Sequence, residues 1–426
     1  MAQFVTAQEA VKHIKDGDRV VLAHSIGEPQ TLVRAMVENY KNYKNVEISH
    51  LLALGPCDYT KPEMEGHLRH NSLFAGPGCR TALAERRADF TPAFFGEAPH
   101  FYEKYLPVDV AMVTVSPPDK HGYCTFGVAV DYSKPCAEMA RTVIAQINKN
   151  MPRTFGDTTI HIDDIDFAVE ADDELYGAKP IALTEVEDKI GANCAALIKD
   201  GSCLQLGIGG IPNAVLNYLH DINDMGVHSE MLSDGILQLI RAGNINNTRK
   251  QIHKGKSVVT FLNGSKDLYS YVDDNPSVEF YPVNYVNNPY VIAQNDNFAS
   301  VNSALSVDLM GQIVADNISS VRQMSGAGGF VDFVRGATAS KNGISIVALP
   351  STAAGGKASR IVSEFEQGRP ITLTRFESFY VVTEFGVALL RGQNLRQRAR
   401  ALIEISHPDF RDEMKEFYEK RFLEKY

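Results

Sequence analysis

The chain contains one sequence pattern twice, and this repeat constrains the fold more than any other feature. The first copy reads IKDGDRVVLAHSIGEP from Ile14, and the second reads IKDGSCLQLGIGGIP from Ile198. In both copies a helix ends at a glycine, a short apolar strand follows, and a loop leads to a proline that opens the next helix. The copies lie 184 residues apart until the loop, where they differ by one residue. The repeat predicts an α/β fold made of two related halves.

The expected elements of both copies follow from the positions of glycine and proline. We expect helices at residues 7–15 and 187–199, and strands at residues 19–23 and 202–206. Between the halves, residues 172–185 are acidic and have the composition of a loop. We therefore expect domains of residues 1–183 and 184–426. The interface between two such domains is a common place for a ligand.

Composition and charge exclude several classes of protein. With 426 residues, 44% hydrophobic and 22% charged, the chain can form two or three globular domains. Its net charge of -10 argues against a nucleic-acid partner, which needs a basic surface. No apolar run approaches the ~18 residues of a membrane span, and the N-terminal residues do not resemble a signal peptide, so we expect a cytoplasmic protein with no membrane partner. The six cysteines lie far apart and predict neither disulfides nor a metal site.

Residues 226–235 read GVHSEMLSDG and contain the main candidate for a reactive side chain, Glu230. The residues alternate in the period-2 manner of a strand up to Leu232, and the Ser-Asp-Gly cluster that follows ends the strand. Ligands of open α/β sheets collect outside the carboxyl ends of the strands, so a carboxylate at this position can reach a substrate. Glutamates near strand ends are also often solvated or cap a helix, and spacing does not distinguish these roles.

Two glycine-rich turns lie in the second half. Residues 207–212 read GIGGIP and join an expected strand to a helix, and residues 325–330 read SGAGGF before another helix. Main-chain amides at the start of a helix attract phosphate or a developing oxyanion, although such turns also serve helix packing. Further strands are expected at residues 108–115, 258–262 and 344–349, and a pair of charged amphipathic helices is expected from about residue 395.

Several long motifs together resemble the acetyl-CoA hydrolase/CoA-transferase family, and within it most closely the 4-hydroxybutyrate and butyryl-CoA:acetate CoA-transferase branch. They occur in the family's order and span nearly the whole chain. The motifs are SPPDKHGYCTFGVAVD, GIGGIP, VHSEMLSDG, VNNP, SGAGGFVDF and VVTEFGVALLRGQNLRQRARALIEISHPDFRDE. The resemblance implies two CoA-transferase-type α/β domains with the active site at their interface, and a ping-pong exchange of CoA between carboxylic acids.

The resemblance also implies roles for individual residues. Glu230 matches the family's catalytic glutamate, which carries a glutamyl-CoA thioester. Asn287 and Gly329 match positions whose main-chain amides form the oxyanion hole. The residues that match the glycine positions beside CoA are Gly207, Gly209, Gly210, Ile211 and Gly328. Phe330 stands where relatives usually carry a polar residue, often glutamine, so we expect only a main-chain contribution from this turn.

The implied partners are small molecules. They are acyl-CoA and short-chain carboxylates, namely 4-hydroxybutyrate or butyrate with acetate, and CoA is a substrate rather than a tightly bound cofactor. The family also implies a homodimer and no metal. The candidates for holding the CoA phosphates are Lys266, Lys341, Lys357 and Arg360.

Three alternatives remain open from the sequence. A thioester hydrolase on the same scaffold would use the same glutamate. A sugar-phosphate isomerase or other binding protein of similar architecture would use the glycine turns for phosphate and form no covalent adduct. A pair of stable domains without chemistry at Glu230 is the third alternative.

Overall fold

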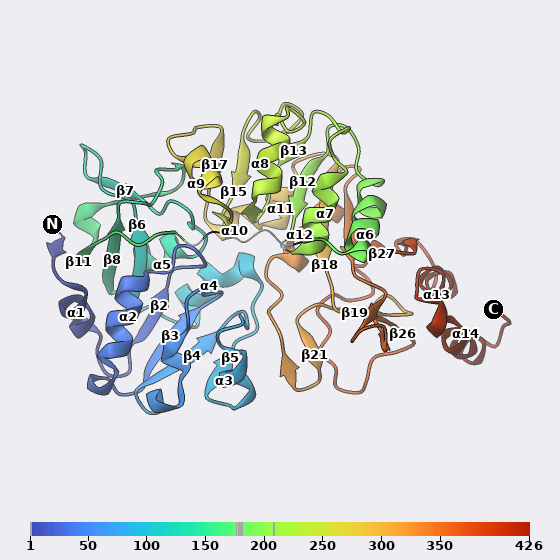
Figure 1. Ribbon diagram of the computed structural model, residues 1–426, viewed down its shortest axis with the longest axis horizontal. Coiled ribbons are helices and arrows are strands. Elements are labelled where there is room, and N and C mark those ends of the chain that lie inside the picture. The colour runs from blue at the N-terminus through green and yellow to red at the C-terminus, as the bar shows by residue number, and fades with distance from the viewer. Residues whose placement is uncertain (1, 176, 178–181, 208) are drawn as a thin grey trace.

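The computed structural model describes residues 2–175, 177, 182–207 and 209–426. Figure 1 shows two bodies side by side, with the N-terminal residues in blue to cyan on the left and the later residues in green to red on the right. Part of the expected join at residues 172–185 falls outside the described residues, and the domain boundary after residue 183 stays a prediction.

The first body contains an eight-stranded sheet built from residues 3–171, and every neighbouring pair of strands in it is parallel. Its order is β1 (Gln3–Phe4), β11 (Phe167–Ala171), β8 (Thr142–Asn148), β6 (Val110–Val115), β2 (Arg19–Leu22), β3 (Val46–His50), β4 (Leu68–Ser72) and β5 (Ala88–Phe90). All six residues of β6 are buried, as is typical of a parallel strand that is covered on both faces. The helices of this body are α1 (Ala7–Ala10), α2 (Gln30–Glu38), α3 (Arg80–Ala84), α4 (Ala98–Lys104) and α5 (Ser133–Met139).

The second body contains a six-stranded sheet that is parallel except for its last pair of strands. Its order is β13 (Gly226–Val227), β12 (Cys203–Leu206), β18 (Phe298–Ser303), β23 (Ile344–Ala348), β27 (Tyr380–Thr383) and β28 (Gly386–Leu389). The helices are α6 (Glu185–Ala195), α7 (Gly210–Asn217), α8 (Asp234–Arg241), α9 (Lys266–Val272), α10 (Val283–Val286), α11 (Pro289–Ile292), α12 (Phe330–Ala339), α13 (Leu395–Glu404) and α14 (Pro408–Phe422). The α/β class predicted from the sequence is confirmed.

The repeat has a direct structural counterpart. Strands β2 and β12 begin and end 184 residues apart, and each leads through a loop into a helix. Pro29 immediately precedes α2, as expected, whereas α7 begins at Gly210 and includes Pro212. The first helix of the first copy is shorter than predicted, because α1 continues as a 3-10 turn over residues 11–13.

Short sheets complete the structure. They are β14 (Met231–Leu232) with β16 (Phe261–Leu262); β15 (Ser257–Val259), β17 (Val278–Phe280) and β9 (Phe155–Gly156); β7 (Tyr123–Thr125) with β10 (Thr159–His161); β19 (Ser306–Asp308), β20 (Ile313–Val314) and β26 (Ile361–Val362); β21 (Asn317–Ser319) with β22 (Arg322–Gln323); and β24 (Thr352–Ala353) with β25 (Ala358–Ser359). The single strand predicted at residues 258–262 is wrong in one respect. The chain forms β15 and β16 instead, which belong to different sheets.

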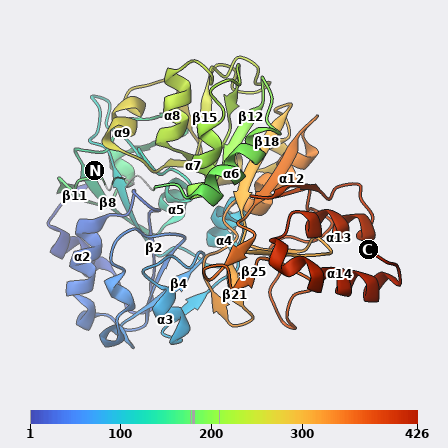
Figure 2. The ribbon, with the colours of Figure 1, turned by 45° about the vertical axis from the view of Figure 1, so that its right-hand side comes forward.

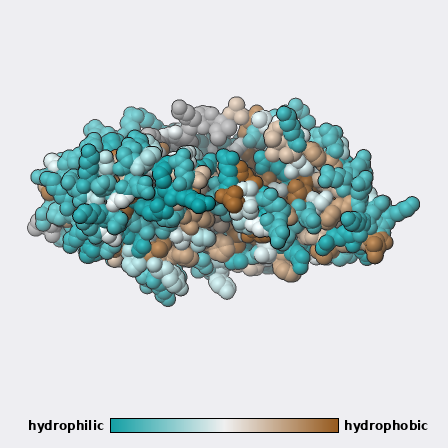
Figure 3. Space-filling view, turned by 90° about the horizontal axis from the view of Figure 1, so that it is seen from below, coloured by the Kyte–Doolittle hydropathy of each residue, from teal (hydrophilic) through white to brown (hydrophobic). Residues whose placement is uncertain are grey.

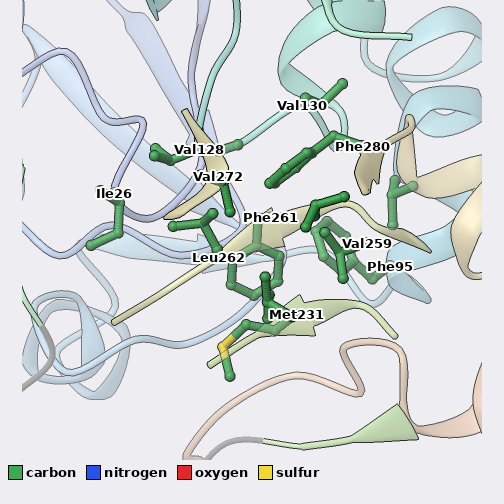
Figure 4. Close-up of a cluster of buried hydrophobic side chains, with 14 of the residues drawn as sticks. Ile26, Phe95, Val128, Val130, Met231, Val259, Phe261, Leu262, Val272 and Phe280 are labelled. Carbon is green, nitrogen blue, oxygen red and sulfur yellow. The ribbon is translucent and has the colours of Figure 1, made fainter. Parts of the chain in front are cut away.

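The two bodies share one hydrophobic core. Side chains of both contribute to it, and Figure 4 shows part of this cluster around Phe95, Phe261 and Met231. Main-chain hydrogen bonds also cross between the bodies: Leu262 N donates to Val128 O at 2.9 Å, and β9 pairs with β17. Because core and main chain are continuous across the interface, the relative position of the two bodies is fixed by packing.

The C-terminal helices α13 and α14 lie next to each other at the end of the second body (Figure 2), which confirms the predicted helix pair. Seen from below, the molecule is mostly hydrophilic, with hydrophobic residues gathered near the middle of this face (Figure 3). None of the helices in the described part of the chain has both the length and the apolar character that crossing a membrane requires.

Close packing of α6 on α7 gives a test of the fold. A Cβ added to Gly191 would lie 2.6 Å from the main-chain carbon of Ala214. We expect Gly191→Ala to lower the free energy of unfolding by about 1–3 kcal/mol, although alanine is the better helix former. Urea denaturation measures this change. Lys189→Ala, on the exposed side of the same helix, serves as the control and should change stability by less than about 0.5 kcal/mol. Equal stability of Gly191→Ala and the parent would contradict the packing.

Candidate active site

Glu230 lies where the chain passes from one sheet to another. The prediction of one continuous strand through this residue is wrong, because β13 joins the six-stranded sheet and β14 pairs with β16. Between them, the main-chain oxygen of Glu230 accepts hydrogen bonds from Thr260 N and Phe261 N at 3.1 and 3.2 Å. These two hydrogen bonds hold the main chain of Glu230 against residues 260 and 261. The side chain of Glu230 lines a cavity.

The histidine of the H-x-E motif positions the segment that faces Glu230. His228 is buried, and its Nε2 donates to the main-chain oxygen of Val286 at 2.8 Å. Burial, with a further contribution from the charge of Lys250, lowers the pKa of His228 to about 3, so the imidazole is neutral near pH 7. This bond holds the end of α10, and the next residue is Asn287.

Asn287 and Gly329 both contact the Glu230 carboxylate. Asn287 Nδ2 donates to Glu230 Oε2 at 2.8 Å, and the main-chain N–H of Gly329 also donates to this carboxylate. The expected main-chain role of Asn287 does not fit this geometry, because its N–H donates to Val283 O at 2.9 Å and closes α10. At Gly329 only a glycine fits, since a Cβ would collide with the Glu230 carboxylate.

The cavity lies between the two bodies and has a volume of about 180 Å³. It is smaller than the cavities of about 300–1,000 Å³ that hold drug-sized ligands, so it suits a small group. Residues of both bodies line it. They include His24, Leu51, Leu52 and Phe74 from the first body, and Gln205, Gly207, Glu230, Met231, Phe261, Asn302, Gly328, Gly329 and Phe330 from the second.

Burial raises the pKa of Glu230 to about 7. The hydrogen bonds from Asn287 and Gly329 lower this pKa and offset part of the effect, whereas the negative charge of Asp131 raises it. A carboxyl group with this pKa is about half ionised at neutral pH. It can therefore serve as a poorly solvated nucleophile there.

Asp332 is a second carboxyl group of the site, and the sequence analysis did not single it out. It is buried in the first turn of α12, and its Oδ2 accepts a hydrogen bond from Gly96 N at 3.0 Å. Burial raises the pKa of Asp332 to about 7, and the charge of Glu230 adds to this increase. The Asn287 side chain also donates to Asp332, so one amide lies between the two carboxyl groups.

The GIGGIP turn contributes to the site in part. Gly207 lines the cavity, and its N–H donates to Val301 O at 3.0 Å. A Cβ at Gly210 would collide with the Glu187 carboxylate of α6, so a larger residue here would have to displace that side chain. Gly209 has a φ of 117°, which favours glycine, and Ile211 is buried in α7. Position 208 lies outside the described residues.

The four basic candidates for the CoA phosphates do not line this cavity. Lys266 pairs with Glu174 at 3.0 Å, and Lys341 pairs with Asp296 at 3.6 Å. Arg360 donates to the main-chain oxygens of Leu305 and Thr352 and holds a local turn. Lys357 is exposed in the turn between β24 and β25. A role of these residues with CoA stays a prediction.

His24 and Asp131 form a buried pair beside the cavity that the sequence analysis did not identify. His24 Nδ1 lies 3.1 Å from Asp131 Oδ2, and the two side chains are 2% and 0% exposed. His24 follows β2, at the carboxyl end of a strand next to the interface. The rule that led to Glu230 could therefore have identified it.

The described residues contain no group of three or more histidine, cysteine, aspartate or glutamate side chains placed to share a metal ion. All six cysteines are buried and free.

Comparison with known proteins defines the class. The N-terminal domain model of the acetyl-CoA hydrolase/transferase family matches residues 1–179, and its C-terminal domain model matches residues 264–418. The chain belongs to this family.

Individual relatives match over nearly the full length. The chain is 55% identical over 421 residues to 4-hydroxybutyrate coenzyme A transferase of Clostridium kluyveri, covering 99% of this chain and 98% of the relative. It is 39% identical to butyryl-CoA:acetate CoA-transferase of Anaerostipes caccae, with 96% and 94% covered. The crystal structure of RipA from Yersinia pestis superposes with a TM-score of 0.94 at 36% identity, covering 99% and 98% of the two chains.

The raised pKa of Glu230 gives a test that does not depend on function. Its pKa in the unfolded chain is near 4.5 and in the folded chain about 7, so the folded state holds the proton more tightly and loses stability as the pH rises from 4.5 to 7. We expect Glu230→Gln to become more stable than the parent over this range and to remain so at pH 8. Thermal unfolding at pH 5 and pH 8 measures this effect.

The control for this test is Glu413→Gln, which replaces an exposed carboxylate in α14. Its stability difference from the parent should change little with pH. A stability difference between Glu230→Gln and the parent that is the same at both pH values would contradict the assigned burial of the Glu230 charge.

Proposed function

We propose that this protein is a CoA-transferase that moves CoA between a short-chain acyl-CoA, 4-hydroxybutyryl-CoA or butyryl-CoA, and acetate, with Glu230 as the nucleophile. The observation that carries the proposal is a partly buried glutamate at an interdomain cavity, held by two hydrogen-bond donors. Family membership and the names of the full-length relatives support the reaction class.

The proposed reaction begins with attack on the thioester. A carboxylate oxygen of Glu230 bonds to the acyl carbon, the carbon–sulfur bond breaks, and CoA leaves as the thiolate. The product is a mixed acyl-glutamyl anhydride. The thiolate then attacks the glutamyl carbonyl carbon, which releases the first carboxylic acid and leaves a glutamyl-CoA thioester. A second acid reverses these steps, so one thioester is exchanged for another and no further reactant is consumed.

Asn287 and Gly329 supply the oxyanion donors in this proposal. When the thiolate attacks the glutamyl carbonyl, negative charge develops on an oxygen of Glu230. The Asn287 side-chain amide and the Gly329 N–H already donate to this carboxylate in the resting structure. Donors that are in place before reaction require little reorganisation, and removal of one such donor costs on the order of 10²–10³ in rate in other enzymes.

Water determines whether the enzyme transfers or hydrolyses. Water that reached the anhydride or the glutamyl thioester would release the acid and CoA separately, which is the hydrolase alternative. The site lies between two bodies that share a core, and the proposal requires this interface to keep water from the two intermediates. The homodimer and the cytoplasmic location implied by the sequence remain part of the proposal.

The direct test is exchange of labelled acetate. The parent is expected to convert butyryl-CoA and ¹³C-acetate to labelled acetyl-CoA, with little free CoA. Glu230→Gln should lose at least about 10³-fold in rate, because the amide cannot act as the nucleophile. Mass spectrometry after exposure to acyl-CoA alone should show a CoA adduct on the peptide that contains Glu230.

Three results would contradict the proposal. Release of CoA without label in acetyl-CoA would identify a hydrolase. Full activity of Glu230→Gln, with deamidation excluded by mass, would remove the nucleophile. Turnover without any adduct on Glu230 would favour direct transfer. Glu413→Gln should match the parent in every assay.

Asp332 gives a prediction about pH. Loss of its negative charge should lower the pKa of Glu230, because like charges raise each other's pKa. For the parent we expect activity to rise with pH through about 7, as Glu230 ionises. In Asp332→Asn the midpoint of this rise should move to lower pH. The pH dependence of kcat/KM measures the midpoint, and Glu413→Gln should leave it in place. A midpoint that is unchanged or higher in Asp332→Asn would contradict the coupling.

A further inference from the structure

The part of the cavity wall that comes from the first body is apolar except for one residue. Its lining residues are Leu51, Leu52, Phe74 and His24. The His24 side chain is 2% exposed, so it has little contact with bulk water. A polar atom in such a place costs free energy unless it has a hydrogen-bond partner.

Asp131 determines which nitrogen of His24 is available. Asp131 Oδ1 accepts hydrogen bonds from Tyr132 N at 2.7 Å, Ser133 N at 3.2 Å and Ser133 Oγ at 3.1 Å. Its Oδ2 faces His24 Nδ1 at 3.1 Å. Because Asp131 Oδ1 already has three donors, its Oδ2 is placed to accept the Nδ1 proton of His24, and an imidazole with that single ring proton has Nε2 as its acceptor. Among the described residues, Nε2 has no hydrogen-bond partner.

Aromatic rings fix the plane of the imidazole. The ring centroids of Phe261 and Phe95 lie 4.7 and 5.1 Å from that of His24, and both contacts are edge-to-face. Both rings are tied to the catalytic region. Phe261 N donates to Glu230 O at 3.2 Å, and Phe95 N donates to Gly328 O at 3.0 Å. The ring of His24 is therefore held in a fixed position relative to the Glu230 carboxylate. His24 and Glu230 line the same small cavity.

We propose that His24 recognises the hydroxyl group at the end of a hydroxyacyl chain, through a hydrogen bond from that hydroxyl to Nε2. This inference rests on the proposed function and names its substrate class: short acyl groups with a terminal hydroxyl, rather than plain alkyl acyl groups. The apolar residues Leu51, Leu52 and Phe74 accommodate the methylene chain. A plain acyl group offers Nε2 no partner in the cavity, and a site built to hydrogen-bond a hydroxyl discriminates against a substrate that lacks one.

The test compares two substrates that differ by one hydroxyl. The ratio of kcat/KM for 4-hydroxybutyryl-CoA to kcat/KM for butyryl-CoA, each with acetate, is measured for the parent, His24→Leu and His24→Gln. We expect the parent to favour the hydroxyacyl substrate. His24→Leu should lower the ratio by about 10- to 100-fold. His24→Gln, whose side-chain oxygen is an acceptor, should recover part of the ratio. Calorimetric binding of free 4-hydroxybutyrate and butyrate gives a second readout that needs no transfer.

The outcomes separate this inference from the proposed function. If the parent transfers CoA but its ratio does not change in His24→Leu, or both substrates lose activity equally in both variants, His24 has only a structural role and the inference is overturned. Equal affinity of the parent for the two free acids, together with equal turnover, also overturns it. If no acyl-CoA is turned over while the binding preference for 4-hydroxybutyrate is lost in His24→Leu, the proposed function fails and only the recognition of the hydroxyl by His24 stands.

Discussion

The active site depends on the partial burial of one carboxylate, Glu230, against the side-chain amide of Asn287. Removing a carboxylate from water costs several kcal/mol, and the hydrogen bonds from Asn287 and Gly329 offset only part of this cost. The part of this cost that is not offset raises the pKa of Glu230 to about 7. A carboxylate that is solvated by two fixed donors instead of mobile water is already in the environment that its reaction needs. The loss of hydration that raises the pKa of Glu230 and makes it reactive also lowers the stability of the folded protein when Glu230 is ionised.

Only the packed pair of bodies can hold Glu230 in this state. The second body provides the step from β13 to β14, and the Nζ of Lys250 supports this step by donating to Val227 O and Lys256 O at 2.8 and 2.7 Å. The first body provides the turn at Phe95 and Gly96, which bonds to Gly328 and Asp332. Without this turn, water would reach both carboxyl groups and their pKa values would return towards ordinary values. The interdomain core is therefore as necessary to the site as the residues that line it.

Sequence reasoning succeeded where a pattern is local. The two copies of the helix–strand–loop unit predicted β2 and β12, because glycine and proline determine helix ends directly. The prediction from sequence is wrong where two strands distant in the chain pair with different parts of one segment. Residues 226–232 alternate like one strand, but β13 pairs with β12 and β14 pairs with β16. The local sequence pattern does not show where one pairing ends and the other begins. The Gly329 position was found from its motif, and the reason for glycine became clear only when Glu230 was seen beside it.

The contacts missed from the sequence share one property, which is a large separation along the chain. His24 and Asp131 are 107 residues apart, and Gly96 and Asp332 are 236 apart. Each member of these pairs is unremarkable alone, and only the three-dimensional fold brings them together. The motif H-x-E-M-x-S-D-G identifies Glu230 but not the groups that change its pKa. A catalytic residue can thus be located from its sequence motif, whereas the electrostatics that make it reactive come from long-range contacts.

Asp131 and Asp332 give the proposed covalent step an electrostatic advantage. The charge of Asp131 raises the pKa of Glu230, and the charge of Glu230 raises the pKa of Asp332, since negative charges in a poorly solvated site repel each other. Acylation converts Glu230 to a neutral anhydride and then to a neutral thioester, so the repulsion is relieved in each intermediate. The charge that leaves Glu230 passes first to the thiolate and then to the released acid. The neighbouring carboxyl groups therefore raise the free energy of the free enzyme more than that of the acylated enzyme, and this difference lowers the barrier to acylation.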